Sequence, residues 1–215
     1  LISSGRLDDL ECVYTSLLGF IEAMNNDHIN VFAVFDNEEV GSVTKQGAMS
    51  TFLVSTLNRI NKALGKSDED YYRAIAKSML ISCDNAHAIH PNHPELFDVK
   101  NRPVLNKGIA IKESANQKYT TDAFSRAVLK KILDKNNIPY QTFANRSDIM
   151  GGSTLGNLSN TAVSMNAVDI GLPQLAMHSA YETAGAKDVE YAIEALRAFF
   201  ETNIDIKDDK VSLEV

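Results

Sequence analysis

The sequence has few cysteines, no long apolar run and no block of basic residues. Its only two cysteines, Cys12 and Cys83, provide neither a disulfide framework nor a CxxC zinc pair. No apolar run approaches the ~20 residues needed to span a bilayer, and no signal-peptide pattern is visible. The net charge of −7, without clustered Lys or Arg, argues against nucleic-acid binding. These absences predict a cytoplasmic protein with neither a membrane nor a nucleic-acid partner.

An alternation of helical and strand patterns predicts one α/β domain. A chain of 215 residues buries roughly 70 % of its unfolded surface, which is enough for a full core. Helical spacing and capping residues predict helices over residues 9–25, 47–64, 67–79, 121–136 and 187–202. Short β-branched or aromatic runs predict strands at 29–35, 79–82, 108–112 and 140–144, and a partly extended segment at 171–177. The stretch 151–160 is rich in glycine and is predicted to be a loop.

Candidate metal ligands occur at the points where apolar segments end. They are Glu38 and Glu39 after 29–35, Asp84 after 79–82, His178 after 171–177, and Asp8 before the first helix. In open α/β sheets, sites form beyond the carboxyl ends of the strands. Carboxylates and an imidazole converging there would suit Zn²⁺, or Co²⁺ or Mn²⁺. A dication would offset the repulsion of the glutamate pair. Because consecutive residues beyond a strand can point in different directions, one glutamate could bind metal while the other acts as general base.

Each of these residues also has a simpler interpretation. A Glu-Glu pair usually belongs to a solvated loop, and Asp8 with Asp9 is typical of a helix N-terminus. Asp84 could be a turn residue, and His178 could be a structural histidine. Pattern and spacing alone therefore favour these interpretations over a metal hydrolase.

Three histidines recur at a spacing that imitates one face of a helix. They are His87, His90 and His93. Pro91 and Pro94 argue against a continuous helix there. The segment is predicted to be a loop that holds His87 and His90 near the site without binding metal.

Six motifs occur in the order found in one enzyme family: SSGRLDDL, FDNEEVGS, CDNAHAIHPN, GIAIKESANQKYTT, SDIMGGSTLGN and GLPQLAMHSAYETAG. From about residue 1 to 200 the chain resembles the M18 metalloaminopeptidases, the aspartyl aminopeptidase family. The resemblance implies an α/β, zinc-exopeptidase-type mixed sheet with helices on both faces, incomplete at the N-terminus. Residues 1–215 would be the C-terminal part of the catalytic domain, without the N-terminal part and an inserted assembly domain. The missing starting Met agrees with a fragment or a processed product.

The resemblance implies a dinuclear zinc aminopeptidase that removes N-terminal residues, with acidic ones as candidates, through a water bridging the metals. By motif, Asp8 resembles the carboxylate shared by both metals, and Glu38 resembles the general base. Glu39 and His178 would complete one site with Asp8, and Asp84 would serve the other. The glutamate pair would then divide proton transfer from metal binding.

Outside the ligand set, the resemblance implies four further site residues. Lys112 and Tyr119 lie where the family shapes its substrate pocket, although Lys112 could equally be a surface residue at a strand end. Gly152 could present a backbone N–H to a bound oxygen, or belong to a plain tight loop. Glu182, placed one helical turn past His178, would orient that histidine.

Two departures from the family pattern affect the expected activity. Asp9 stands where the family usually has Asn, a change we expect to be secondary. None of the five histidines belongs to a His-x-Asp motif, which in the family supplies a ligand of the second metal. The chain therefore offers three protein ligands to one metal and two to the other, and it is expected to be weak or inactive alone.

Two other functions stay open. One is a related dinuclear zinc amidohydrolase or carboxypeptidase, although the motifs MHSAYE and HAIHPN favour the aminopeptidase. The other is a non-catalytic assembly fragment, which the missing histidine suggests. For the full-length protein, peptide substrates and a homo-oligomer are expected.

Overall fold

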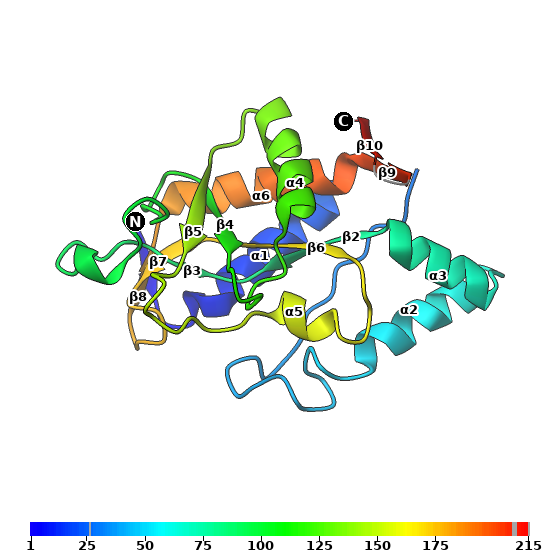
Figure 1. Cartoon of the computed structure of the whole chain (residues 1–215), viewed down its shortest axis with the longest axis horizontal. Coiled ribbons are helices and arrows are strands. Elements are labelled where there is room, and N and C mark those ends of the chain that lie inside the picture. The colour runs from blue at the N-terminus through cyan, green and yellow to red at the C-terminus, as the bar shows by residue number, and fades with distance from the viewer. Residues whose placement is uncertain (26, 208–209, 215) are drawn as a thin grey trace.

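A four-stranded mixed sheet lies at the centre of the computed structural model, which describes residues 1–25, 27–207 and 210–214 (Figure 1). Its strands, in spatial order, are β2 (Met79–Cys83), β6 (Asn166–Gly171), β4 (Ile109–Glu113) and β5 (Tyr140–Ala144). The pairs β2–β6 and β4–β5 are parallel, and β6–β4 is antiparallel. This arrangement confirms the predicted mixed sheet and leaves β2 and β5 at its two edges.

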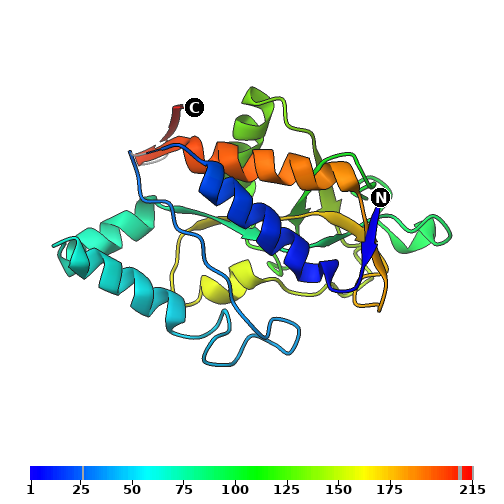
Figure 2. The ribbon, with the colours of Figure 1, turned by 180° about the vertical axis from the view of Figure 1, so that it is seen from behind.

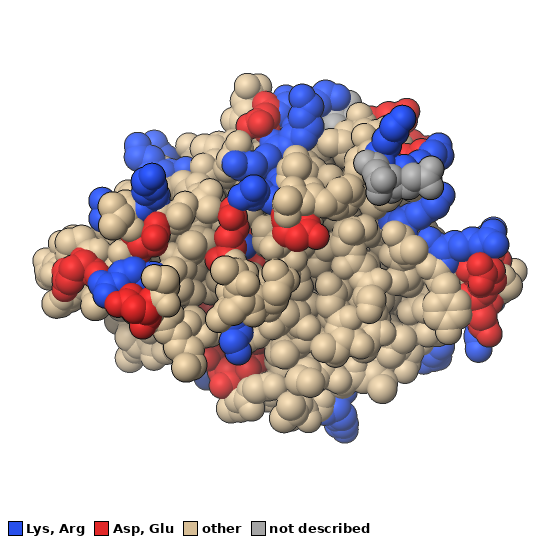
Figure 3. Space-filling view, viewed as in Figure 1, with Lys and Arg blue, Asp and Glu red and all other residues tan. Residues whose placement is uncertain are grey.

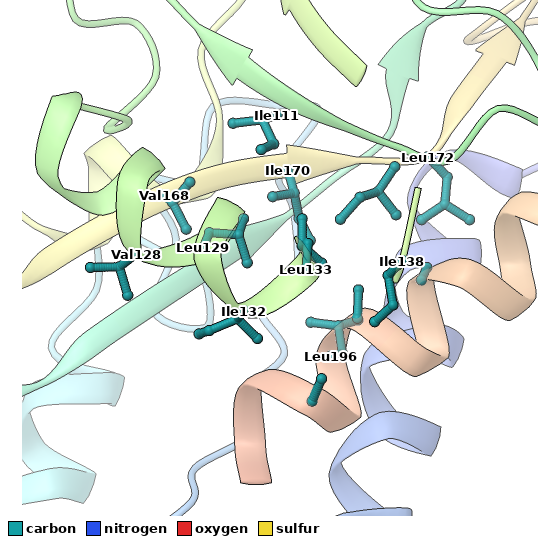
Figure 4. Close-up of a cluster of buried hydrophobic side chains, with 14 of the residues drawn as sticks. Ile111, Val128, Leu129, Ile132, Leu133, Ile138, Val168, Ile170, Leu172 and Leu196 are labelled. Carbon is teal, nitrogen blue, oxygen red and sulfur yellow. The ribbon is translucent and has the colours of Figure 1, made fainter. Parts of the chain in front are cut away.

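Three helices cover one face of this sheet: α1 (Leu7–Glu22), α4 (Ala123–Lys135) and α6 (Ala186–Glu201). The main core lies between them and the strands, and includes Ile111, Ile170, Leu129 and Leu133, all fully buried (Figure 4). The helices α1 and α6 cross so closely that a Cβ at Gly19 would stand 2.8 Å from the Leu196 Cβ. A glycine is therefore required at this crossing.

Capping residues determine where two of the helices begin. The Asp122 carboxylate accepts a hydrogen bond from the Ser125 backbone N–H at 2.7 Å and starts α4. Ser67 starts α3 (Asp68–Lys77) in the same way, through the Asp70 N–H at 3.1 Å. Both form capping boxes, which satisfy N–H groups that the first turn leaves without partners. Both starts confirm the prediction from sequence.

The opposite face of the sheet carries a shorter layer. A small cluster of Ala86, Ala110, Tyr119 and Phe143 lies there. It is joined by α5 (Leu155–Ser159), whose Gly156 N–H donates to the Ser82 Oγ of β2 at 3.0 Å. The loop predicted over 151–160 is therefore wrong at Leu155–Ser159, because packing against β2 stabilises a helical turn that the composition does not reveal.

A second four-stranded sheet extends past the ends of β2 and β6. Its order is β1 (Ile2–Ser4), β8 (Glu182–Ala184), β7 (Pro173–Leu175) and β3 (Ala86–His87). In it, Ile2 lies opposite Ala184, so the start of the chain meets its last quarter. A two-stranded sheet, β9 (Asn203–Lys207) and β10 (Lys210–Glu214), follows α6.

The strand predicted at 29–35 is not formed. In the described part of the chain, no backbone hydrogen bond outside the helices and strands involves residues 29–35, and none of these residues is buried. Figure 2 shows the segment as a thin trace running between α1 and the pair formed by α2 (Phe52–Ala63) and α3. It lacks a neighbouring strand, and a strand needs a hydrogen-bonding partner as well as an apolar composition.

The remaining helix predictions differ from the structure mainly at their ends. The helix predicted over 47–64 is shortened to α2, and the histidine-rich loop contains β3 and a 3₁₀ turn, η1 (Pro94–Leu96). Among the helices described, none has the length and apolarity to cross a bilayer. Lys and Arg are interspersed with Asp and Glu in the view of Figure 3, and a broad area without charged side chains lies over α5.

Candidate metal centre

Asp8 lies at the centre of the candidate site, at the start of α1. Asp8 and Asp9 have non-helical backbone angles inside the first turn of that helix. The side chain of Asp8 is only 3 % exposed. A carboxylate withdrawn from water in this way needs a compensating partner for its charge.

One group of three candidate ligands meets at Asp8. The His178 Nε2 lies 3.0 Å from the Asp8 Oδ2 and 3.2 Å from the Glu39 Oε1. One ligand atom from each residue lies within 4.8 Å of the other two. These are the three residues that the resemblance assigns to one zinc ion, and the fold brings them together from the start, the first loop and the last quarter of the chain.

A second group shares Asp8 and adds Asp84 and Asp9. Their carboxylate oxygens also lie within 4.8 Å of one another. Asp9 was expected to be secondary, yet its Oδ1 is buried and makes no hydrogen bond in the described structure. The Asp-Asp doublet before the first helix was the signal for this residue.

The carboxylates raise one another's proton affinity. Burial, followed by the charges of Asp84 and Glu39, raises the pKa of Asp8 to about 8. Burial and the Asp84 charge also raise the pKa of Asp9 well above its ordinary value. A dication would relieve both effects, because it is the largest compensating charge that such a site can hold. An oxygen and nitrogen donor set of this kind fits Zn²⁺.

Glu38 lies half-buried beside the two groups. Burial, with the charges of Asp84 and Glu39, raises its pKa to about 7. A general base is most effective when its pKa lies near the working pH. Tight turns hold the loop, through hydrogen bonds from Gly41 N–H to the Glu38 carbonyl at 2.9 Å and from Ser42 N–H to the Asn37 carbonyl at 3.0 Å.

Glu182 ties two of the candidate ligands to one carboxylate. Its Oε1 accepts a hydrogen bond from the His178 backbone N–H at 2.7 Å, and its Oε2 accepts one from the Asp8 backbone N–H at 3.0 Å. Glu182 is 2 % exposed and lies on β8, so the expected helical turn between it and His178 is wrong. It contacts the histidine through the backbone, because a tight turn precedes β8, with Ser179 N–H bonded to the Ala176 carbonyl at 3.0 Å.

Lys112 and Tyr119 lie together in the interior. The Lys112 Nζ is 3.1 Å from the Asp84 Oδ2 and 5.5 Å from the centre of the Tyr119 ring. Lys112 is 2 % exposed, so the alternative of a surface lysine at a strand end is wrong. Burial lowers its pKa, but the Asp84 carboxylate and Tyr119 raise it further, leaving it above its ordinary value.

The other predicted residues lie outside both groups. Gly152 is exposed in the segment before α5, and a side chain there would contact nothing within 4 Å. His87 is exposed on β3 and belongs to neither group of ligands that the described residues form. Their predicted roles stay predictions.

Beneath the ligands lies a buried polar network that the sequence reasoning missed. The Asn85 Nδ2 donates to the Glu11 Oε2 at 3.0 Å and to the Gln174 Oε1 at 3.2 Å, and its Oδ1 accepts from the Cys12 Sγ at 3.3 Å. Burial raises the pKa of Glu11 to about 7. The adjacent Gly171 lets β6 pass the Asp84 carbonyl, which a Cβ would approach to 2.0 Å. The signal for Asn85 was its place next to Asp84, at the end of an apolar strand.

The chain is similar to known proteins along most of its length. A family model described as aminopeptidase I zinc metalloprotease (M18) matches residues 1–200. The chain is 49 % identical over 199 residues to a probable M18 family aminopeptidase 2 of Clostridium novyi (strain NT), and this match covers 93 % of the chain. It is 39 % identical over 207 residues to a probable aspartyl aminopeptidase of Ricinus communis, again over 93 % of the chain. The solved dodecamer of S. cerevisiae mApe1 has a TM-score of 0.80 at 28 % identity, over 93 % of the chain and 45 % of that structure.

The match covers less than half of the length of each of these relatives. The chain covers 46 % of the Clostridium protein and 42 % of the Ricinus protein. It thus spans about half the length of these relatives, and includes the candidate ligands Asp8, Glu39, Asp84 and His178 within the matched residues. The chain belongs to the M18 family of aminopeptidase I zinc metalloproteases.

Proposed function

We propose that this chain is the metal-binding part of a zinc aminopeptidase that removes N-terminal residues from peptides. The observation that carries the proposal is the pair of ligand groups sharing Asp8. The names of the relatives, M18 family aminopeptidase and aspartyl aminopeptidase, support the same activity.

Each ligand has a defined task in this proposal. Glu39 and His178 would hold one Zn²⁺ ion with Asp8. Asp84 would hold a second one, also with Asp8, and Asp9 belongs to the same group of carboxylates. Bound zinc would polarise the scissile carbonyl and acidify the attacking water.

Glu38 is the group for proton transfer. With its pKa near 7, it would take a proton from the attacking water and later give it to the departing amine. Glu182 would hold Asp8 and His178 in position relative to each other, by accepting hydrogen bonds from their backbone N–H groups.

A preference for acidic N-terminal residues follows from Lys112. It is a buried cation beside the ligands, paired with Asp84 at 3.1 Å. With Asp84 serving as a metal ligand, Lys112 would be able to pair with a substrate carboxylate. Tyr119, under the ammonium group, would hold it in place.

We further propose a weak or inactive isolated chain, because the second ion would have only carboxylate ligands from it. The full-length protein would act as a homo-oligomer, as the S. cerevisiae relative is described as a dodecamer. The cytoplasm is its proposed compartment.

The test compares Asp-, Leu- and N-acetyl-Asp-peptide substrates, with the zinc-loaded chain alone and combined with the unmatched part of the Clostridium novyi relative. We expect cleavage of Asp- and Leu-peptides in the combined sample, with Asp preferred, and loss of cleavage in Glu38→Gln. A Lys112→Met variant should lose the preference for Asp over Leu. Faster cleavage of the N-acetylated substrate would favour the amidohydrolase, and no cleavage by the combination would favour the assembly fragment.

A further inference from the structure

The side-chain amide of Asn85 connects its own segment, between β2 and β3, to α1 and to the start of β7. Its Nδ2 donates to the Glu11 Oε2 at 3.0 Å, to the Gln174 Oε1 at 3.2 Å and to the Leu172 carbonyl at 3.3 Å. Its Oδ1 accepts from the Cys12 Sγ at 3.3 Å. Asn85 is 3 % exposed, so these groups stand in place of water around a buried amide.

Each of the three connected segments carries a candidate metal ligand. Asp84 directly precedes the amide in the sequence. On α1, Glu11 follows Asp8 after one helical turn, and on β7, Gln174 precedes the turn that leads to His178. The amide therefore lies where the chain segments that hold three of the ligands meet.

The side chains of Glu11 and Gln174 depend on this amide. In the described part of the chain, the Glu11 Oε1 and the Gln174 Nε2 are buried without a hydrogen bond. The remaining side-chain oxygen of each residue accepts from Asn85. Because a buried polar group that loses its partner destabilises its surroundings, loss of the amide would loosen the contact between α1, β7 and the segment after β2.

Asp84 relies on this contact more than the other ligands do. Glu182 accepts hydrogen bonds from the backbone N–H groups of Asp8 and His178, but none of its described hydrogen bonds reaches the segment of Asp84. Lys112 holds the Asp84 side chain at 3.1 Å from β4, inside the central sheet. The hydrogen bond from the neighbouring amide to α1 is thus what ties the segment of Asp84 to the helix that carries Asp8.

We propose that Asn85 is a positioning residue for the second metal ion, because it sets the spacing between Asp84 and Asp8. It would act on the carboxylate group, which consists of Asp8, Asp9 and Asp84. The histidine group, the one that contains His178, would keep the support of its own hydrogen bonds. The inference rests on the proposed function, since it requires both groups to bind metal, and it names the residue that governs the second ion.

Two different metal ions separate the two groups in an experiment. An imidazole with carboxylates suits Zn²⁺, whereas oxygen ligands alone suit Mn²⁺. The metal-stripped chain is loaded with one equivalent of Zn²⁺, which calorimetry follows, and is then titrated with Mn²⁺ while electron paramagnetic resonance measures the free ion. In Asn85→Leu, similar in size but without polar side-chain atoms, Mn²⁺ affinity should fall about 10- to 100-fold and Zn²⁺ affinity by less than about threefold.

A matched pair of variants at Glu11 tests the hydrogen bond to α1. Glu11→Gln and Glu11→Leu both remove the charge, but only the first keeps an oxygen that can accept from Asn85. Mn²⁺ should therefore bind about fivefold more weakly to Glu11→Leu, the effect of one ordinary hydrogen bond. Glu11→Leu replaces a buried charge with an apolar side chain, so it should fold even if Asn85→Leu does not, as circular dichroism would show.

The control for an amide elsewhere is Asn136→Leu. Its Nδ2 donates to the Ile132 carbonyl at 2.9 Å at the end of α4, so this variant should change neither metal affinity. Equal losses of Zn²⁺ and Mn²⁺ affinity in Asn85→Leu would make Asn85 a general structural residue, and unchanged affinities would remove it from the site. Equal Mn²⁺ affinities in the two Glu11 variants would mean that the bond to α1 does not set the spacing.

The parent chain distinguishes failure of this inference from failure of the proposed function. A parent that bound Zn²⁺ but no Mn²⁺ would overturn the role of Asn85 and leave the histidine group as a metal site. A parent that bound neither ion would overturn the proposed function as well.

Discussion

Strand β6 and the run 29–35 both contain β-branched apolar residues, yet they differ in structure. The run 29–35 is the more apolar of the two, because β6 also contains Asn166 and Asp169. β6 pairs on both edges and is buried at all but its first residue. In the run 29–35, Ile29 is 65 % and Val34 46 % exposed, and none of the strands that the structure describes pairs with it. The comparison teaches that apolar composition makes a segment competent for a sheet, whereas partners on its edges make it a strand.

The metal centre shows the same contrast. Asp8 comes from the side built on α1 and β8, where Glu182 holds its backbone, and its side chain is 3 % exposed. Glu39 comes from the loop after 29–35, and its side chain is 57 % exposed. Affinity for metal should therefore depend more on buried Asp8 than on exposed Glu39.

The largest effect is expected from Asp8→Asn, because Asp8 belongs to both ligand groups. Losing an outer partner of a ligand already costs about 10- to 100-fold in metal affinity, so losing the shared ligand should cost more than about 100-fold. Zinc titration of the metal-stripped chain by calorimetry measures this. The control is Glu190→Gln, an exposed acid on α6. Unchanged affinity in Asp8→Asn would remove Asp8 from the site.

The raised pKa of Asp8 should make the stability of the metal-free chain depend on pH. The pKa of Asp8 is about 8 in the folded chain, against an ordinary value of 3.8. Between these values the unfolded chain binds fewer protons than the folded one, so the free energy of unfolding should fall as pH rises from about 4 to about 8. Zinc affinity should rise over the same interval, as the ligand loses its proton.

Urea denaturation in chelator at pH 5 and pH 8 checks this dependence. The Asp8→Asn variant should show a flatter profile, with Glu38 and Glu11, whose pKa values are raised to about 7, contributing the same sign. An unchanged profile in the variant would mean that Asp8 is not the group that titrates.

Identical valine truncations on the two sides compare their packing directly. Val168→Ala in β6, at a fully buried position, should lower the free energy of unfolding by about 2–3 kcal/mol through lost burial and a residual cavity. Val34→Ala should cost less than about 1 kcal/mol, since the residue is half exposed. Denaturant titration of both variants measures the difference. Equal costs would mean that 29–35 is packed as firmly as β6.

Sequence patterns were sufficient to predict the helices and strands that depend mainly on their own residues. Periodicity and caps predicted α3, α4 and α6, and apolar runs predicted β2, β4 and β5. The short strands β1, β3 and β8 were not predictable, because they exist only through pairs such as Ile2 with Ala184, across almost the whole chain. At 29–35 the apolar composition predicted a strand, but no strand in the described part of the chain lies beside it to form the hydrogen bonds.

The residues of the candidate site also divide into those that sequence patterns could predict and those that they could not. The positions of Asp84, Glu39 and His178 followed from the ends of apolar segments. The place of Glu182 did not, because its partners are backbone N–H groups whose direction depends on the turn before β8. The inclusion of Asp9 likewise depends on non-helical backbone angles inside the first turn of α1.

A smaller effect is expected from Glu182→Gln. The carboxylate accepts two backbone N–H bonds, one with each oxygen, whereas an amide offers one acceptor and turns an NH₂ group toward the other donor. Zinc affinity should fall about tenfold, while Glu190→Gln again serves as control. If only folding stability changed and affinity did not, Glu182 would be structural rather than a positioning residue for the ligands.

The smallest effects are expected from removing the two helix caps, Asp122 and Ser67, which should differ in their effect on global stability. Asp122→Ala removes the cap of α4, whose Leu129, Ile132 and Leu133 are fully buried, and should lower the free energy of unfolding by about 1 kcal/mol. Ser67→Ala removes the cap of α3, which buries only Tyr71. That helix should fray at its N-terminus while global unfolding changes by less than about 0.5 kcal/mol. Denaturant titration with hydrogen exchange of both helices separates local from global loss. An equal loss of unfolding free energy in the two variants would mean that α3 unfolds together with the core. The difference in packing would then be confined to residues 29–35.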